Sequence, residues 1–115
     1  MRALAMDLNS KIQEFDGNVL KMIEKYAPSD ENKTIRYSNF VTKELGKDTV
    51  TFSDMPQLMS AIIKFENTKP TRDYYLSDPN KMKTALALAF NEDGTNRQLD
   101  SNLSFEEAKE IAGLD

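Results

Sequence analysis

The stretch LMSAIIKFENTKP, residues 58–70, decides the fold, because it joins a long apolar helix to an abrupt break. Leu58, Ile62 and Phe65 recur at helical spacing, so one face of the segment is apolar and needs to be buried. The asparagine and the proline that follow predict that the helix ends at Glu66. This lone acid is therefore either the last charge before a turn or an acid placed for chemistry.

The same helical periodicity extends outward in both directions. We expect six helices, at about residues 3–14, 19–26, 35–45, 53–66, 77–90 and 104–112. Asn18 can cap the second helix, Gly46 can end the third, and SFEE at 104–107 has the form of a capping box. The sequence thus predicts an all-α fold, a single compact domain of about five to six short helices.

The same apolar periodicity and capping residues predict several helix boundaries and inward-facing side chains. Thr34 is the expected N-cap of the third helix and Ser53 that of the fourth. Residues 47–52 alternate like a short strand or form a connector, with Val50 and Phe52 inward, and Leu20 is expected to face the core. Residues 67–76 are expected to form a loop.

Two parts of unequal size are expected. Residues 1–90 should form the helical core domain, and residues 91–115 a loop plus a C-terminal helix, packed on the core or appended to it. No internal repeat and no low-complexity linker separates them.

Composition excludes several classes of function. The chain has 115 residues, 39% hydrophobic and 30% charged, which suits one domain with one core. Its net charge is −4 with interleaved signs, which argues against a nucleic-acid partner. There is no cysteine and no histidine, so Ser-His-Asp and Cys-His chemistry are excluded within the chain. Carboxylates would have to carry any catalysis.

No apolar run approaches the roughly 20 residues that span a bilayer, so we expect no membrane span. We also expect no cofactor and no metal. The loop before Glu107 can be aligned with a calcium-binding loop, but Asn96 and Gln98 stand where acids are needed and Ser101 where glycine is needed. Asp100 alone leaves too little negative charge for tight binding.

The turn YAPSDENKT, residues 26–34, is dense in polar groups. Asp30, Glu31 and Asn32 could bind a ligand, or they could satisfy free backbone groups at two helix ends. The chemistry of these residues alone favours the second role. Glu66 has a similar alternative, because a carboxyl at the end of an apolar helix is either desolvated, as a general acid requires, or simply solvated.

These motifs together resemble a family of small tailed-phage and prophage proteins usually labelled virion structural proteins. The family pattern carries Tyr-Ala-Pro-x-x-Glu-Asn-x-Thr and closes with an apolar helix ending in Glu-Asn-Gly or Glu-Ser-Gly. The matching residues here are Arg2, Ala3, Ile23, Tyr26, Ala27, Pro28, Glu31, Asn32, Thr34, Tyr37, Ile62, Ile63, Glu66 and Asn67.

The chain also departs from this pattern. Thr68 replaces the closing glycine and Lys25 replaces an arginine. The upstream half with Asn-Asn-Pro-Gly-Asn is missing, and residues 70–115 have no counterpart.

The resemblance implies a phage virion-associated structural or interaction domain, which could act at the host cell wall. Its partners would be other virion proteins or peptidoglycan, and it would be found in the virion or, before assembly, in the host cytoplasm. The candidate binding residues are Asp30, Glu31, Asn32 and Asn67.

Two alternatives remain open. A peptidoglycan-cleaving, lysozyme-like domain would use Glu66 as its general acid, with Asp73, Asp30 or Glu31 as second carboxylate. A small cytosolic helical adaptor unrelated to phage is the other. We favour a non-catalytic role, because the missing upstream half would supply the substrate contacts.

Overall fold

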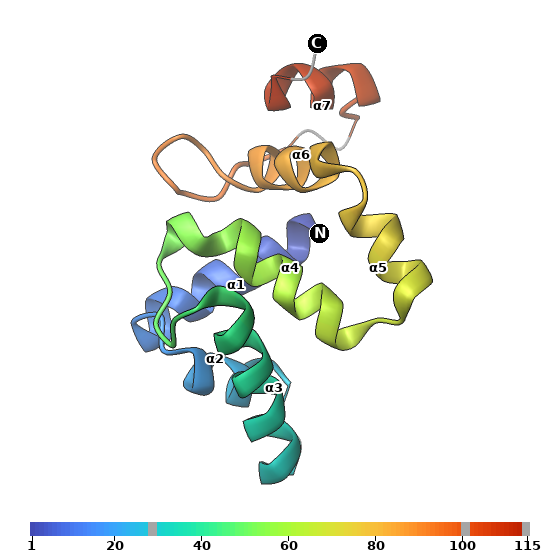
Figure 1. Ribbon diagram of the computed structural model, residues 1–115. Coiled ribbons are helices and arrows are strands. Elements are labelled where there is room, and N and C mark those ends of the chain that lie inside the picture. The colour runs from blue at the N-terminus through green and yellow to red at the C-terminus, as the bar shows by residue number, and fades with distance from the viewer. Residues whose placement is uncertain (28–29, 100–101, 114–115) are drawn as a thin grey trace.

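The computed structural model describes residues 1–27, 30–99 and 102–113 and confirms the all-α prediction. No strand occurs within these ranges, and the helices form one compact globule (Figure 1). Their number is slightly above the predicted five to six. The elements, in chain order, are α1 Arg2–Phe15, α2 Val19–Tyr26, α3 Glu31–Leu45, the 3-10 helix η1 Phe52–Asp54, α4 Met55–Glu66, α5 Lys69–Leu76, α6 Pro79–Ala89 and α7 Phe105–Ala112. Within the described ranges, none of the helices is long and apolar enough to span a membrane.

Helix α4 lies at the centre of the globule and packs against α1, α3 and α5 (Figure 1). Leu58 and Ile62 of the predicted apolar face are buried, Phe65 is only partly buried, and Met59 is buried as well. Leu8 of α1 and Val41 of α3 close the core around them. Each large apolar side chain buried in this way contributes about 1.5–3 kcal/mol, so this face is the main stabilising element of the fold.

The link between α1 and α2 is fixed by the segment that follows α3. The amide of Val50 donates to the carbonyl of Gly17 at 2.9 Å, and the amide of Val19 donates to the carbonyl of Asp48 at 3.0 Å. One isolated antiparallel bridge joins Asn18 and Thr49, so residues 47–52 form a connector. Asn18 also caps α2 as predicted, by accepting from the amide of Lys21 at 3.0 Å.

Two residues predicted to face inward do not. Phe52 is 42% exposed, although the edge of its ring contacts Phe90 at a centroid distance of 4.9 Å. Leu20 is also 42% exposed, and Met22 of the same helix is buried instead. Both residues lie in the first turn of a helix, where apolar spacing is compatible with two inward faces and packing against the neighbouring helices selects one.

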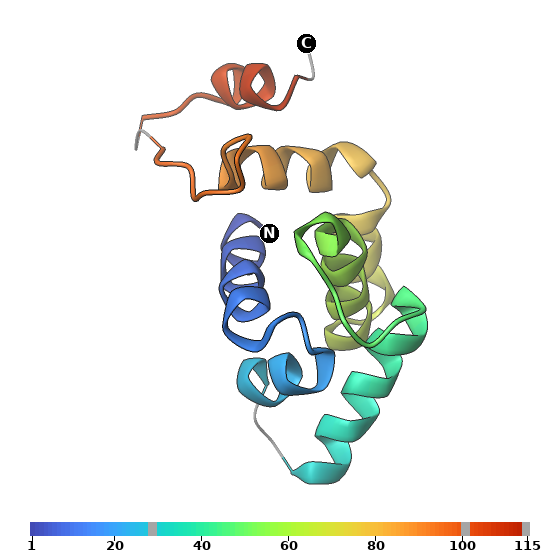
Figure 2. The ribbon, with the colours of Figure 1, turned by 90° about the vertical axis from the view of Figure 1, so that its left-hand side faces the viewer.

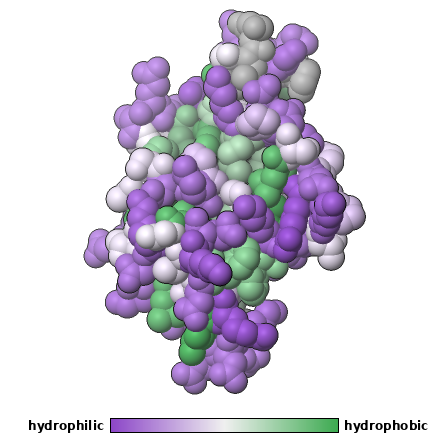
Figure 3. Space-filling model, viewed as in Figure 1, coloured by the Kyte–Doolittle hydropathy of each residue, from purple (hydrophilic) through white to green (hydrophobic). Residues whose placement is uncertain are grey.

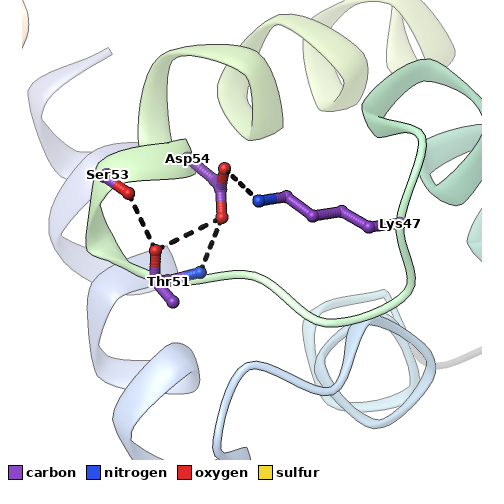
Figure 4. A network of polar contacts seen from close by, with 4 residues as sticks. All are labelled: Lys47, Thr51, Ser53 and Asp54. Carbon is purple, nitrogen blue, oxygen red and sulfur yellow. Dashed lines mark hydrogen bonds and ion pairs between the residues drawn. The ribbon is translucent and has the colours of Figure 1, made fainter.

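A polar network fixes the short 3-10 helix η1 that leads into α4 (Figure 4), so α4 itself begins at Met55, two residues later than predicted, with Asp54 as its N-cap. Thr51, not Ser53, is the N-cap of η1, and its amide donates to the Asp54 carboxylate at 2.8 Å. Lys47 pairs with the same carboxylate at 2.7 Å. This ion pair and the Thr51 amide hold the pKa of Asp54 below its usual range. Ser53 contributes only through its hydroxyl, 2.9 Å from that of Thr51.

Helix α3 also begins earlier than predicted. Asp30, not Thr34, is its N-cap, and the Asp30 carboxylate accepts from the amide of Lys33 at 2.9 Å. Thr34 is buried one turn inside the helix. The reason is that an aspartate in extended conformation reaches the free amides of the first turn better than a residue already inside the helix.

The predicted loop at 67–76 is wrong, because α5 occupies most of it. Pro70 lies in the first turn of α5, where its missing N–H costs nothing. The guanidinium of Arg72 donates to the carbonyl of Asn67 at 2.7 Å and fixes the corner between α4 and α5. Helix α6 then begins at Pro79, two residues later than predicted, with Asp78 as its cap.

The C-terminal segment is joined to the rest through α6. Helix α7 packs on α6, on the side away from α1 to α4 (Figure 2). Its predicted capping box is confirmed, with the amide of Glu107 donating to the hydroxyl of Ser104 at 3.1 Å. Arg97 donates to the carbonyl of Ala87 at 2.9 Å, and Arg2 donates to the carbonyl of Arg97 at 2.9 Å. The loop after α6 is thereby fastened to both α1 and α6.

Candidate functional site

Glu66 is the last residue of α4 and lines a hollow of about 200 Å³ at the protein surface. The rings of Tyr26 and Tyr75 and the side chain of Asn67 also line it. The remaining lining residues are apolar: Met1, Leu4, Ile62 and Ile63. Glu66 itself is exposed, so water reaches its carboxylate and the desolvation that a general acid needs is missing.

Tyr37 is a buried neighbour of Glu66 and Tyr26, two residues that line this hollow. It is 2% exposed, and within the described chain its hydroxyl has no partner at hydrogen-bonding geometry. Burial raises the pKa of Tyr37 far above the ordinary tyrosine range, and the neighbouring Glu66 carboxylate raises it further. A buried hydroxyl without a hydrogen-bond partner costs desolvation free energy, so the Tyr37 hydroxyl reduces the stability of the fold.

Tyr26 connects the hollow to α1. Burial first, then the charges of Glu66 and Asp7, raise the pKa of its phenol. Asp7 is paired with Lys11 at 2.6 Å, and the Lys11 ammonium lies 5.7 Å from the centre of the Tyr26 ring. The two carboxylates therefore create a negative potential at Tyr26, but only that of Glu66 lines the hollow.

Asn67 has a structural role at the end of α4. Its side-chain amide donates to the carbonyl of Ile63 at 2.9 Å, and its own carbonyl accepts from Arg72. These bonds satisfy groups that the helix end leaves free. Asn67 therefore fixes the orientation of the hollow's rim.

The other candidate binding residues lie elsewhere. Asp30, Glu31 and Asn32 form the start of α3, which points away from α4 and α5 (Figure 1). Asp30 caps the helix, and the side chains of Glu31 and Asn32 are exposed. None of the three lines the hollow beside Glu66, so Asn67 is the one candidate binding residue that the structure brings together with Glu66.

Comparison with protein-family models, with curated proteins and with solved structures gives no match.

The described part of the hollow offers one carboxylate, that of Glu66. Asp73, the other acid suggested as a partner, does not line it. Glycoside hydrolysis needs two carboxyl groups across the scissile bond, and this arrangement supplies one. Among the described residues, no group of three or more acids could hold a metal ion. Asp100, the acid of the calcium-like loop, lies outside the described residues.

Some residues of this site could not be found from the sequence alone. Asp7 and Lys11 stand four apart on one helix, a spacing that predicts their ion pair. Nothing in the sequence placed that pair beside Tyr26. Tyr75 lies in the segment predicted to be a loop, so its contribution became visible only when α5 was known.

Proposed function

We propose that this chain is a non-catalytic interaction domain of a phage virion, which binds its partner through Glu66. The virion context is supported by the resemblance of residues 2–67 to the phage family. The non-catalytic role is supported by one observation: Glu66 is an exposed acid without a second carboxylate in its hollow. The partner would be another virion protein or peptidoglycan.

The chemistry of the hollow suits a cationic side chain of the partner. The Glu66 carboxylate makes no ion pair with any described residue. Two tyrosine rings flank it, and such rings attract an ammonium or guanidinium group by about 0.5–1 kcal/mol at exposed sites. The apolar floor can take the methylene stem of a lysine or arginine. A volume of about 200 Å³ lies below the roughly 300–1,000 Å³ of ordinary ligand pockets, so it fits one side chain better than a sugar chain.

The test uses Glu66→Gln, which keeps the shape and removes the charge. Glu31→Gln is the matched control, because Glu31 is an exposed acid outside the hollow. A lysine-centred peptide, acetyl-Gly-Lys-Gly-amide, is titrated into each labelled protein and followed by NMR. We expect shifts at Tyr26, Tyr75 and Asn67 in the wild type and in Glu31→Gln, and none in Glu66→Gln. Equal binding by all three proteins would disprove the role of Glu66.

Catalysis is tested on the same proteins with purified cell walls. We expect the turbidity of the suspension to stay unchanged for both wild type and Glu66→Gln. Clearance by the wild type that is lost in Glu66→Gln would establish the lysozyme-like alternative instead. Mass spectrometry of gradient-purified phage particles distinguishes the virion domain from a cellular adaptor. The chain should be present in the particles if it is a virion domain and absent from them if it is a cellular adaptor.

A further inference from the structure

A second hollow, of about 660 Å³, lies where α5, α6 and α7 meet the start of α1. Its volume falls within the roughly 300–1,000 Å³ typical of ligand sites. Glu66 does not line it, but Met1 and Tyr75 line both hollows, so the second hollow lies next to the candidate site above. Apolar side chains, green in Figure 3, show between hydrophilic residues on the face that carries these helices.

One wall of this hollow carries an exposed aromatic ring that is held in place. Tyr74 is 63% exposed, yet its ring meets that of Tyr75 edge to face at 5.0 Å. The ammonium of Lys81 lies 3.6 Å from the centre of the Tyr74 ring and donates to the Tyr74 carbonyl at 2.5 Å. Leu88 and Ala108 extend the apolar wall. A fixed ring loses little conformational entropy when a ligand binds, so the wall is prepared for contact.

The rim of the hollow is cationic, although the whole chain has a net charge of −4. Arg2, Lys81 and Lys109 line it, against one acid, Asp78. The Asp78 carboxylate already accepts from the amide of Asn80 at 2.9 Å as the cap of α6. The local charge is therefore opposite to that of the molecule.

Arg2 is the best-positioned of these cations. Its Nε donates to the carbonyl of Leu88 at 3.0 Å and its Nη2 to that of Arg97 at 2.9 Å. These bonds use two of the five N–H donors of a guanidinium, so three remain for a carboxylate. The bonds also fix the orientation of the side chain.

We propose that this hollow binds a short acidic segment of a partner protein. An apolar side chain of the segment packs against Tyr74, Leu88 and Ala108, and carboxylates on either side of it meet Arg2 and Lys81. The three cations come from three different helices around an apolar wall. A peptide with acids flanking an apolar residue matches this arrangement, whereas a free fatty acid carries one carboxylate at one end.

The experiment titrates the full labelled chain with acetyl-Glu-Phe-Glu-amide and follows the amide signals by NMR. Lys81→Met removes one cation of the rim. Lys83→Met is the matched control, since it makes the same change on the same helix at an exposed residue that does not line the hollow. We expect shifts at Tyr74, Leu88 and Ala108, and a roughly three- to fivefold loss of affinity in Lys81→Met, as for a single exposed charge pair. Lys83→Met should bind as the wild type does.

Two further probes decide what the hollow recognises. Acetyl-Gln-Phe-Gln-amide keeps the size and removes the charges, and equal binding of this peptide would overturn the acidic specificity. Octanoate carries one carboxylate on an apolar chain, and binding tighter than that of the acidic peptide would overturn the assignment to a protein segment. If Lys81→Met and Lys83→Met lose the same affinity for the acidic peptide, the loss reflects the net charge of the protein and the proposed site is wrong. These outcomes do not depend on the lysine-peptide experiment, so the acidic-peptide site can be correct even if Glu66 binds no lysine peptide.

Discussion

The ring of Tyr37 lies nearly flat against the ring of Phe65, with centroids 3.9 Å apart and planes inclined by 21°. Phe65 in turn contacts Phe40 at 5.5 Å, so α3 and α4 meet through three aromatic rings. The stack holds the Tyr37 hydroxyl in the interior beside Glu66, the next residue along α4. The contact that joins the two helices therefore also keeps the Tyr37 hydroxyl buried next to a carboxylate.

Tyr37→Phe should stabilise the protein or leave its stability unchanged. The change keeps the stack with Phe65 and removes a buried hydroxyl that makes no hydrogen bond, which relieves up to about 1 kcal/mol. Urea denaturation measures the free energy of unfolding. Tyr26→Phe is the control, because its half-exposed phenol can be solvated. A loss of stability of more than about 1 kcal/mol in Tyr37→Phe would mean that the hydroxyl is hydrogen-bonded after all.

Glu66→Gln should leave stability within about 0.5 kcal/mol of the wild type, because Glu66 is exposed and makes no ion pair with a described residue. The change should instead lower the pKa of Tyr26, since a neutral amide no longer opposes the phenolate charge. Ultraviolet absorbance during alkaline titration detects this change, and Glu31→Gln should not produce it. An unchanged Tyr26 titration would show that the two groups are not coupled.

Asp54→Asn should reduce stability in a pH-dependent way. The pKa of Asp54 is lowered in the folded state by Lys47 and the Thr51 amide, so its contribution is complete above the unfolded pKa of about 4. This contribution is lost as the pH falls through the lower folded value. The wild type should therefore be more stable than Asp54→Asn at neutral pH by roughly 0.5–1 kcal/mol, and the difference should vanish in acid.

Urea denaturation between pH 7 and pH 2 follows that difference. Asp73→Asn is the control, since Asp73 is exposed and makes no ion pair within the described chain. A difference that stays constant through acid pH would contradict the assigned ion pair.

Asp30→Ala should cost about 0.5–2 kcal/mol, because it removes the side chain that caps α3. Asn32→Ala should be close to neutral, since Asn32 is an exposed residue of the first turn. Thermal unfolding by circular dichroism compares the two variants. The reverse order of their midpoints would refute the cap assignment.

Gly17→Ala should be the most damaging of the single substitutions considered. A Cβ at Gly17 would stand 1.9 Å from the carbonyl oxygen of Val50, and the residue has φ +76°. The clash and the left-handed backbone together should cost on the order of 3 kcal/mol or more. Gly46→Ala has a similar φ but open space, so it should cost only about 1 kcal/mol. Similar losses in the two variants would show that the connector can move away from Gly17.

The sequence by itself determined the helical class and the central helix. Apolar residues at helical spacing in 58–66 specify one buried face, and burial of that face requires other helices around it. Local signals also placed several ends correctly, among them the Asn18 cap, the Gly46 end and the Ser104 capping box. These features depend on residues within one turn of each other, so local chemistry is enough to specify them.

Where the sequence was compatible with two local structures, contacts between distant segments selected one of them. Pro70 is equally compatible with a loop and with the first turn of a helix, and the bond from Arg72 to Asn67 accompanies the helix. Leu20 and Met22 point to different sides of α2, and packing against the neighbouring helices buries Met22 and leaves Leu20 exposed. Both hollows gather residues from several helices, far apart in the chain. Such sites depend on packing between distant segments, which periodicity along one helix does not encode.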